Sequence, residues 1–543
     1  MEDSTPRRKR LVLATLCATM FMAMLDNVVV NNALPRIGRQ LHADVGALQW
    51  VVEGYSLVYA ALLLTGGTLG DRYGRRRIFL TGLALFTAGS AAAGLSWSTG
   101  LLVAARMLQG VGAALLTPGS LSILRNVFPD ERERARAVGL WSGVSALGLA
   151  VGPVVGGPLV EAFGWASVFW INVPIGVAGL LLAARTLPEF STGVRRLDPA
   201  GQALSALGLA ALVYALIEGP ARGWTDPGVL ACGSAAAVLL PLFVLVELRV
   251  TDPMLDVRFF RDPALGAAAV SGFMVSFGMF GVAFFLPLLM QDVMGWAPSD
   301  AGLAGLPMTA MIVLAAPLAG ALTARRGPRL PLVAGLALCG ASLAGLSLYD
   351  GHARYPHYLW VLLAMGLGMG MTFTPVSITV MRRVDPARAG AASAIVNTLR
   401  ELGGVVGVVV LGAVLTSRLN SSLAGALDRL GVPPEGRHLP TGAAPVPGLV
   451  GGDGPGGALR DAVDTAFTEG LHLALRCGGA ALAATAVLVA VLLRPALTRE
   501  PDAAPDLSTG TTGTTGTTGT TAIMGTEART EAGAGAGPGP IGR

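Results

Sequence analysis

Three ionisable residues interrupt apolar segments that are long enough to cross a membrane. Asp26 lies in the segment 11–34, Glu53 lies in 47–67, and Arg106 lies in 100–124. With a helical rise of about 1.5 Å per residue, the two carboxylates fall at similar depths and the guanidinium slightly farther out. Charged side chains inside a bilayer are costly and usually mark functional sites. We therefore expect these three side chains to share one layer of the same helical bundle.

A membrane carboxylate beside an arginine can couple transport to protons. Desolvation and a neighbouring cation shift the pKa of a carboxyl group in opposite directions. Movement of Asp26 relative to Arg106 would therefore change the affinity of Asp26 for a proton. We predict Asp26 as the proton-coupling residue, with Glu53 and Arg106 as its neighbours. The alternatives are a hydrogen bond at Asp26 that only fixes helix packing, and cation binding at Glu53.

A second polar group interrupts the apolar segment 389–415. Asn397, Arg400 and Glu401 lie near the middle of this segment. By the same argument they are candidates for substrate binding or coupling. A purely structural contact between these side chains and neighbouring helices is the alternative.

The composition indicates an integral membrane protein. Hydrophobic residues make up 52% of the 543 residues, and charged residues only 13%, which is about half of the ~25% that is usual for soluble domains. A membrane-spanning helix needs about 20 apolar residues. Fourteen segments meet this requirement: 11–34, 47–67, 78–97, 100–124, 137–160, 165–185, 200–219, 228–247, 263–290, 299–322, 331–349, 357–380, 389–415 and 469–493. The sequence therefore predicts an all-α integral membrane protein with 14 transmembrane helices.

The distribution of basic residues predicts the orientation of the chain. If the N-terminus is cytoplasmic, the six short outer loops carry only four basic residues: Arg36, Arg39, Arg222 and Arg354. The cytoplasmic loops carry many more, as the positive-inside rule requires. Both termini, 1–10 and 494–543, are then cytoplasmic, and the Gly/Thr repeat in the second predicts a disordered tail. The Gly- and Pro-rich segment 416–468 is expected to form a mostly irregular extracytoplasmic loop.

Several kinds of site are excluded or disfavoured. Lys9 is the only lysine, so the chain has no G-x-x-x-x-G-K-[ST] phosphate loop for ATP hydrolysis. The four cysteines lie in apolar segments without C-x-x-C spacing, and the histidines form no H-E-x-x-H motif. We therefore expect neither disulfides nor a metal site. The net charge of +5 does not indicate nucleic-acid binding, because the basic residues lie in short clusters between apolar segments.

An internal repeat predicts how the helices are grouped. The sequence GTLGDRYGRRR at 67–77 aligns without a gap with GALTARRGPRL at 320–330. Parallel repeats of six helices place these loops at equivalent positions if the seventh and eighth helices are an inserted pair. We predict a six-helix bundle over 11–185, an inserted pair with flanking loops over 186–262 and a second bundle over 263–493. The alternative is that two unrelated hairpins each collected glycine and arginine.

The first of these loops has the composition of a cytoplasmic gate. A carboxylate at a helix boundary can pair with arginines, or with a helix N-terminus of the other bundle, and hold a gate closed. Anchoring by the positive-inside rule alone explains the arginines but neither Asp71 nor Gly74. The predicted gate motif comprises Gly67, Gly70, Asp71, Arg72, Gly74, Arg75 and Arg76.

The fifth apolar segment contains GLAVGPVVGGPL at 148–159. Gly148, Gly152, Gly156 and Gly157 allow close approach of a neighbouring helix. Pro153 removes a backbone donor and kinks the helix. A bent and tightly packed helix beside the other bundle suits a seal that opens and closes, and ordinary use of Gly and Pro in membrane helices is the alternative.

These motifs together resemble one branch of a transporter superfamily. GTLGDRYGRRR, RMLQGVGAALLTP at 106–118 and GLAVGPVVGGPL resemble signatures of the major facilitator superfamily. LDNVVVNNALP in the first segment, GWASVFWINVPIG entering the sixth, fourteen spans and a large loop before the last helix resemble its fourteen-helix drug:proton antiporters, the EmrB/QacA subfamily. The resemblance covers about residues 10–495.

The resemblance implies a major facilitator fold and an exporter without a cofactor. The expected function is export of hydrophobic or cationic drugs or antibiotics across the inner membrane of a bacterium, in exchange for protons and driven by the proton motive force. The expected partners are a drug-like molecule, protons and the lipid bilayer, with the chain as a monomer. Two alternatives remain: a proton-coupled importer on the same fold, and a membrane receptor or scaffold that transports nothing.

Overall fold

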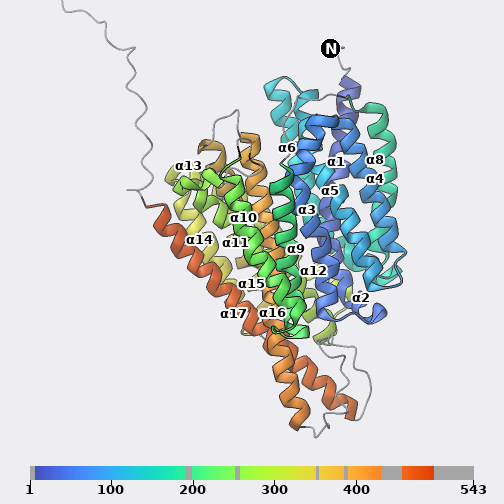
Figure 1. Ribbon diagram of the computed structural model, residues 1–543, viewed down its shortest axis with the longest axis vertical. Coiled ribbons are helices and arrows are strands. Elements are labelled where there is room, and N and C mark those ends of the chain that lie inside the picture. The colour runs from blue at the N-terminus through green and yellow to red at the C-terminus, as the bar shows by residue number, and fades with distance from the viewer. Residues whose placement is uncertain are drawn as a thin grey trace, which may run out of the picture. The chain divides into compact units, whose positions relative to one another are not determined.

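The computed structural model describes residues 6–189, 198–250, 253, 257–349, 354–383, 389–429 and 455–494 (Figure 1). Throughout these ranges the regular structure is helical, and they contain no strand. The same residues include twelve helical segments that are long and apolar enough to cross a membrane, and two bent helix pairs bring the total to fourteen. The predicted all-α membrane fold is confirmed.

The first group of helices is called the first bundle. It comprises α1 (Pro6–Val29), η1 (Val30–Ala33), α2 (Leu34–Leu41), α3 (Val45–Tyr73), α4 (Arg75–Gly94), α5 (Thr99–Val127), α6 (Glu131–Phe163), α7 (Ser167–Trp170) and α8 (Asn172–Thr186). In this bundle α1 packs against α6 and α8, and α5 packs against α3 and α4. Asp26, Glu53 and Arg106 lie on these helices.

The last group of helices is called the second bundle. It comprises η2 (Val257–Arg261), α11 (Pro263–Leu288), η3 (Leu289–Val293), α12 (Pro298–Ala304), α13 (Leu306–Arg326), α14 (Arg329–Leu346), α15 (Tyr355–Arg383), α16 (Ala389–Arg429) and α17 (Pro455–Leu492). Here α16 packs against α11 and α17, and α14 packs against α15 and α17.

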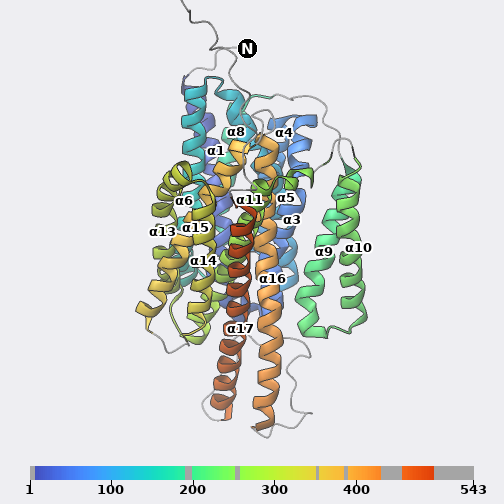
Figure 2. The same cartoon turned by 90° about the vertical axis from the view of Figure 1, so that its left-hand side faces the viewer.

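Two further helices, α9 (Pro199–Arg222) and α10 (Pro227–Glu247), lie between the bundles in the sequence. They pack against each other as a pair, which Figure 2 shows in green at one edge. α9 also contacts α3 of the first bundle and α16 of the second. Leu57 of α3, Val213 of α9 and Val405 of α16 belong to one apolar cluster. The predicted division into two six-helix bundles and an inserted pair remains a prediction.

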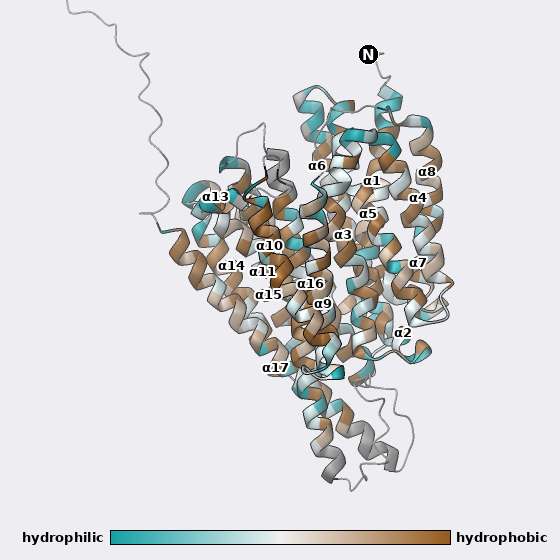
Figure 3. Ribbon diagram, in the orientation of Figure 1, coloured by the Kyte–Doolittle hydropathy of each residue, from teal (hydrophilic) through white to brown (hydrophobic). Residues whose placement is uncertain are grey.

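The helices carry mostly hydrophobic residues along their middle and more hydrophilic residues near their ends (Figure 3). Large side chains such as Val238 and Leu318 are about two-thirds exposed in the structure, as expected for residues that face lipid. We call the end of the bundles at which α1 begins the proximal end, and the end at which α1 finishes and α3 begins the distal end.

Aspartate and proline define where several helices begin. Asp198, Asp226 and Asp262 each accept a hydrogen bond from a backbone N–H group of the helix that follows. Proline follows each of them, and its fixed φ and missing N–H suit the first position of a helix. The sequence pair Asp-Pro therefore marks the start of α9, α10 and α11.

The prediction that 416–468 forms an irregular loop is wrong for the part of this segment that the structure describes. α16 continues to Arg429, and α17 already begins at Pro455. Arg418 on α16 forms an ion pair with Glu469 on α17 at 3.1 Å. Most of the glycine and proline that suggested an irregular loop lies at 430–454, outside the described residues. Residues 495–543, on which the predicted disordered tail falls, also lie outside them.

Candidate functional site

Asp26 and Arg106 form an ion pair inside the first bundle. Nη1 of Arg106 on α5 lies 2.6 Å from Oδ2 of Asp26 on α1, and both side chains are completely buried. Neither charge is in contact with solvent, so each depends on its partner. Removing one member of such a buried pair typically costs about 3–5 kcal/mol, because an uncompensated charge remains.

Two amide side chains complete the environment of Asp26. Nε2 of Gln109 donates to Oδ1 of Asp26 at 3.1 Å, and Nδ2 of Asn172 donates to the same oxygen at 2.6 Å. Both amides also donate to Oγ of Ser90, at 2.8 and 3.0 Å. The resulting buried network joins α1, α4, α5 and α8. Its polar groups hold the ionised carboxylate in a fixed position.

A close approach of α4 and α5 makes this network possible. A Cβ atom at Gly89 on α4 would lie 2.8 Å from Cγ of Gln109 on α5, so only glycine fits. Arg106 and Gln109 are three residues apart and therefore lie on the same face of α5. Ser90, next to Gly89, can then reach Gln109.

Arg106 also contacts α3. Its Nε donates to the backbone oxygen of Val51 at 3.1 Å. Its guanidinium lies 4.5 Å from the ring centroid of Tyr55, within the range of a cation–π interaction. Nη2 of Arg106 has no hydrogen-bond partner among the described residues. Arg106 thus connects α5 to both α1 and α3 and keeps one donor available.

Glu53 does not join the hydrogen-bond network around Asp26, although it lies on α3 together with Tyr55, which contacts Arg106. The side chain is buried, and Oε2 has no hydrogen-bond partner in the described part of the chain. Its charged neighbours are Glu401, on α16 of the second bundle, and Arg106. The structure therefore brings Asp26 and Arg106 together and places Glu53 toward the second bundle.

The second predicted group lies on α16, opposite α3. The guanidinium of Arg400 lies 4.2 Å from the ring centroid of Phe373 on α15, and its Nε has no hydrogen-bond partner in the described chain. Tyr59 on α3 is an electrostatic neighbour of both Arg400 and Glu401. Asn397 is exposed on the same helix. Polar groups of the two bundles therefore face each other between α3 and α16.

Comparison with known proteins identifies the family. Residues 16–408 match the sequence profile of the Major Facilitator Superfamily. The chain belongs to this superfamily. It is therefore a transporter rather than an enzyme.

Three relatives align with this superfamily member over most of their own length. The chain is 38% identical to the "Multidrug resistance protein Stp" of Mycobacterium tuberculosis (strain CDC 1551 / Oshkosh), over 89% of this chain and 91% of that protein. It is 35% identical to the "Tetracenomycin C resistance and export protein" of Streptomyces glaucescens, over 90% and 92% of the two chains. It is 37% identical to the "Methylenomycin A resistance protein" of Streptomyces coelicolor (strain ATCC BAA-471 / A3(2) / M145), over 78% and 89%.

Solved structures of other transporters share the fold. A bacterial homologue of the human lysosomal transporter Spinster, crystallised in an inward-facing and occupied conformation, has a TM-score of 0.65 at 17% identity. It aligns with 90% of this chain and 97% of its own. The peptide transporter POT in complex with sulfate has a TM-score of 0.59 at 18% identity, over 89% and 95% of the two chains.

The two bundles of this superfamily member contact each other at the distal end. Nε2 of Gln49 on α3 donates to the backbone oxygen of Val408 on α16 at 2.9 Å. Nε2 of Gln291 in η3 donates to the backbone oxygen of Asn32 in η1 at 3.1 Å. Arg39 on α2 forms an ion pair with Asp292 in η3, and the Asp292 side chain is fully buried. These contacts join the two bundles at the distal end.

The predicted gate motif is held by partners in the first bundle. Asp71 on α3 forms an ion pair with Arg75 on α4, and the backbone N–H of Arg76 donates to Oε1 of Glu189 at 3.2 Å. Gly74 has φ +104°, and a Cβ there would collide with the Glu189 carboxylate, so this tight turn requires glycine. Gly67, Gly70 and Arg72 lie in the preceding turns of α3. Pairing of Asp71 with the second bundle stays a prediction.

The predicted seal on α6 contacts two different helices. A Cβ at Gly148 would lie 3.1 Å from Cβ of Met24, and one at Gly156 would lie 2.8 Å from Cγ2 of Val29, so both glycines face α1. Gly152, between these two glycines, packs against Val28 of α1. α6 bends by 40° between Leu149 and Val151, one turn before Pro153, where the proline ring meets the preceding turn.

The last glycine of this motif faces the second bundle. Gly157 contacts the backbone of Pro298 and Ser299, at the start of α12. The backbone oxygen of Pro153 accepts a hydrogen bond from Nδ2 of Asn32 at 2.8 Å, and Gly302 on α12 contacts the same carbonyl. α6 therefore lies between α1 and α12.

Sequence reasoning missed several of these residues. Gln109 follows Arg106 by one helical turn, and Asn172 lies in the quoted motif GWASVFWINVPIG, so their positions gave a signal that was not used. Arg39 and Asp292 gave none, because they belong to separate loops 253 residues apart in sequence. Within the described residues no cluster of His, Cys, Asp and Glu has the composition of a metal site.

Proposed function

We propose that this chain is a proton-coupled antiporter that exports hydrophobic or cationic drugs or antibiotics across a bacterial cell membrane. Membership of the superfamily supports transport, and the names of the relatives support export of antibiotics. The observation that carries the proton coupling is the fully buried pair of Asp26 and Arg106. The chain is proposed to act as a monomer, because each of its bundles supplies part of the transport path.

The proximal end is proposed to face the cytoplasm. It carries the arginine-rich turn between α3 and α4 and the beginning of α1, with Arg7, Arg8, Lys9 and Arg10. Basic loops are retained on the cytoplasmic side. With the distal contacts formed, the substrate path between the bundles is then closed on the outer side.

Proton binding at Asp26 is the proposed coupling step. The ionised carboxylate is held by Arg106, Gln109 and Asn172. A proton that binds one of its oxygens removes the charge that attracts Arg106, so the proton and the guanidinium compete for the same group. Release of Arg106 loosens the connection of α1 to α5. One charge crossing 100 mV supplies about 2.3 kcal/mol.

The glycines of α6 connect this step to the other bundle. α1 packs on Gly148, Gly152 and Gly156, whereas Gly157 packs on α12. A shift of α1 relative to α5 therefore moves α6 against α12. This transmission suits alternating access, in which two bundles rock about a central site. In the opposite state the proximal end is proposed to be closed by the gate motif around Asp71.

The facing surfaces of α3 and α16 are the proposed substrate path. Glu53 and Glu401 provide negative charge, and Tyr59 and Phe373 provide aromatic surface for an organic cation. Arg400 and Asn397 lie on the same helix as Glu401 and are proposed to line this path. A role of Glu53 as a second proton site is the alternative to substrate binding.

Transport in everted membrane vesicles tests the proposal. Vesicles acidified inside should accumulate a fluorescent organic cation such as ethidium, or the antibiotics tetracenomycin C or methylenomycin A. Asp26→Asn should abolish this accumulation. The exposed carboxylate Glu161 provides the matched control, since Glu161→Gln makes the same chemical change at the protein surface. Full activity of the Asp26→Asn variant at every pH would overturn the coupling site.

The same assay separates the alternatives. An importer would expel the substrate from acidified everted vesicles instead of accumulating it. A receptor or scaffold would move no protons when substrate is added to proteoliposomes that contain the purified protein. An exporter should release protons in proportion to the substrate that it moves.

A further inference from the structure

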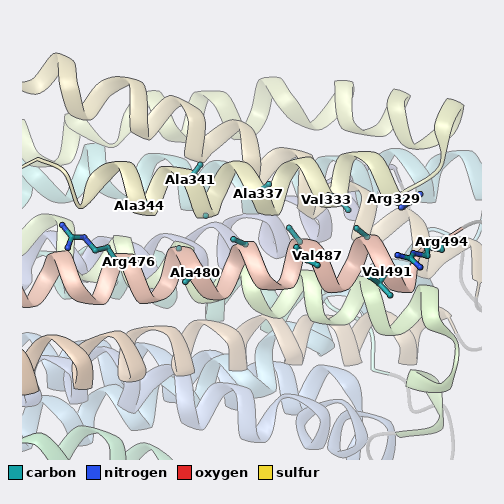
Figure 4. Close-up of a pocket in the computed structure, with 15 residues that line it drawn as sticks. Arg329, Val333, Ala337, Ala341, Ala344, Arg476, Ala480, Val487, Val491 and Arg494 are labelled. Atoms are coloured by element: carbon teal, nitrogen blue, oxygen red, sulfur yellow. The ribbon is translucent and has the colours of Figure 1, made fainter.

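A groove lies on the outer surface of the second bundle, between α14 and α17. It has a volume of about 810 Å³, within the ~300–1,000 Å³ range of pockets that bind small molecules. Figure 4 shows its side chains along the two helices, with Arg329 and Arg494 at one end and Arg476 at the other. The groove is remote from Asp26 and Arg106, which lie in the other bundle.

Small residues form the walls of the groove. Gly340 on α14 and Gly479 on α17 are in close backbone contact and bring the two helices together at its floor. Val487 is 66% exposed and Val491 is 41% exposed, so the groove opens outward, toward the lipid. The remaining apolar lining residues are Val333, Ala337, Ala341, Ala344, Ala480, Ala483, Ala486 and Ala490.

The length of the groove matches the membrane. Arg476 and Arg494 are separated by roughly 27 Å along α17 at 1.5 Å per residue, close to the ~30 Å thickness of the hydrocarbon core. Arg329 and Arg494 therefore lie at the height of the head groups on the proximal side. Arg476 lies at the opposite height, where its Nε donates to Oγ of Ser347 at 3.3 Å.

We infer that the groove binds an anionic phospholipid. The acyl chain lies against the alanines and valines, and the phosphate lies between Arg329 and Arg494. Two cations at the mouth of an apolar groove complement a molecule that has an apolar chain and a negative head group. Basic pockets between membrane helices bind such lipids at the cytoplasmic surface. The inference goes beyond the proposed transport function and does not depend on it.

A second copy of the chain is a less suitable occupant. Two copies in one membrane are related by an axis along the membrane normal, so an interface at this groove brings equivalent ends together. Arg329 and Arg494 of one copy would then face the same residues of the other. Juxtaposed like charges oppose association, whereas an anionic head group is attracted by both arginines.

Native mass spectrometry of the purified full-length protein tests this inference. Phosphatidylglycerol and phosphatidylcholine with the same acyl chains are offered in equal amounts, and the lipid retained by the protein is measured. The wild-type protein should retain phosphatidylglycerol preferentially. In the double variant Arg329→Gln/Arg494→Gln, the ratio of retained phosphatidylglycerol to phosphatidylcholine should fall by about fivefold for each arginine removed.

The chain offers a matched charge control. Arg325 and Arg326, at the end of α13, are exposed at the same end of the bundle but do not line the groove. The double variant Arg325→Gln/Arg326→Gln has the same net charge as the test variant and should retain phosphatidylglycerol like the wild type. Equal losses in the two double variants would mean that only the overall charge of this surface matters, and would overturn the site.

Filling the groove tests its apolar part. Ala483→Phe, at an exposed groove position, should lower the retention of phosphatidylglycerol, whereas Leu314→Phe, on the exposed face of α13, should not. Both side chains project from the protein surface, so both variants should fold. A protein dimer that Ala483→Phe disrupts, with no change in bound lipid, would assign the groove to a second copy and overturn the inference.

Discussion

Arg39 and Asp292 form an ion pair that joins the two bundles at the distal end. Asp292 is fully buried, whereas the Arg39 side chain is 36% exposed. One oxygen of Asp292 binds Arg39, and the other has no hydrogen-bond partner among the described residues. In the closed state the charge of Asp292 therefore depends strongly on Arg39. In the proposed transport cycle, opening of the distal end would separate the two residues.

We predict that Arg39→Gln shifts the protein toward the distal-open state more than Asp292→Asn does. The first change leaves a buried carboxylate without its cation in the closed state, whereas the second leaves a neutral amide. Spin labels at Phe163 on α6 and Trp360 on α15, both strongly exposed, report the distance between the distal ends. Double electron–electron resonance should show a larger long-distance population in Arg39→Gln.

The double variant is the control for this experiment. Arg39→Gln leaves the Asp292 carboxylate buried without its cation, and Asp292→Asn removes that negative charge. The double variant should therefore resemble Asp292→Asn alone. Independent effects of the two changes would instead add. Additive shifts, or identical distance distributions in all variants, would contradict a role of the pair in distal closure.

We predict that a second substitution in the Asp26–Arg106 pair restores stability but does not restore transport. Arg106→Gln should lower the free energy of unfolding by about 3–5 kcal/mol, because Asp26 remains buried with only amide partners. In the double variant Asp26→Asn/Arg106→Gln neither charge remains, so thermal unfolding should recover toward the wild-type Tm. Transport should stay absent in both. Recovery of proton-driven transport in the double variant would show that the pair is structural only.

The sequence predicts the helices and the membrane depth of the polar residues more completely than their partners. Apolar length and Asp-Pro starts are local signals, so the segments and the depth of Asp26 can be read along the chain. Whether Glu53 meets Arg106 or Glu401 depends on the rotation of α3, which several neighbouring helices determine together. Asp292 looks like an ordinary loop carboxylate until folding places η3 against α2.

Substitution of alanine should have unequal effects at Gly74 and Gly327, which occupy equivalent positions in the predicted internal repeat. Both have positive φ values, +104° and +79°, so alanine is strained by about 1–3 kcal/mol at either position. A Cβ at Gly74 also meets the Glu189 carboxylate, whereas nothing lies within 4 Å of one at Gly327. Gly74→Ala should therefore lower Tm more than Gly327→Ala. Glu189→Ala should remove the difference, and its persistence would contradict this explanation.

We predict that the close contact of α6 with α12 at Gly157 is needed for the distal end to close. Gly157→Val adds a side chain where α6 meets Pro298 and Ser299 of α12, so the bundles cannot approach fully at the distal end. Gly143→Val is the matched control on the same helix, because nothing lies within 4 Å of a Cβ at Gly143. Labels at Phe163 and Trp360 should report a longer distance in Gly157→Val only, and its transport rate should fall by tenfold or more. If the distance between the labels in Gly157→Val is the same as in the wild type, the contact between α6 and α12 does not control distal closure. This result would contradict the proposed transmission of movement from α1 through α6 to the second bundle.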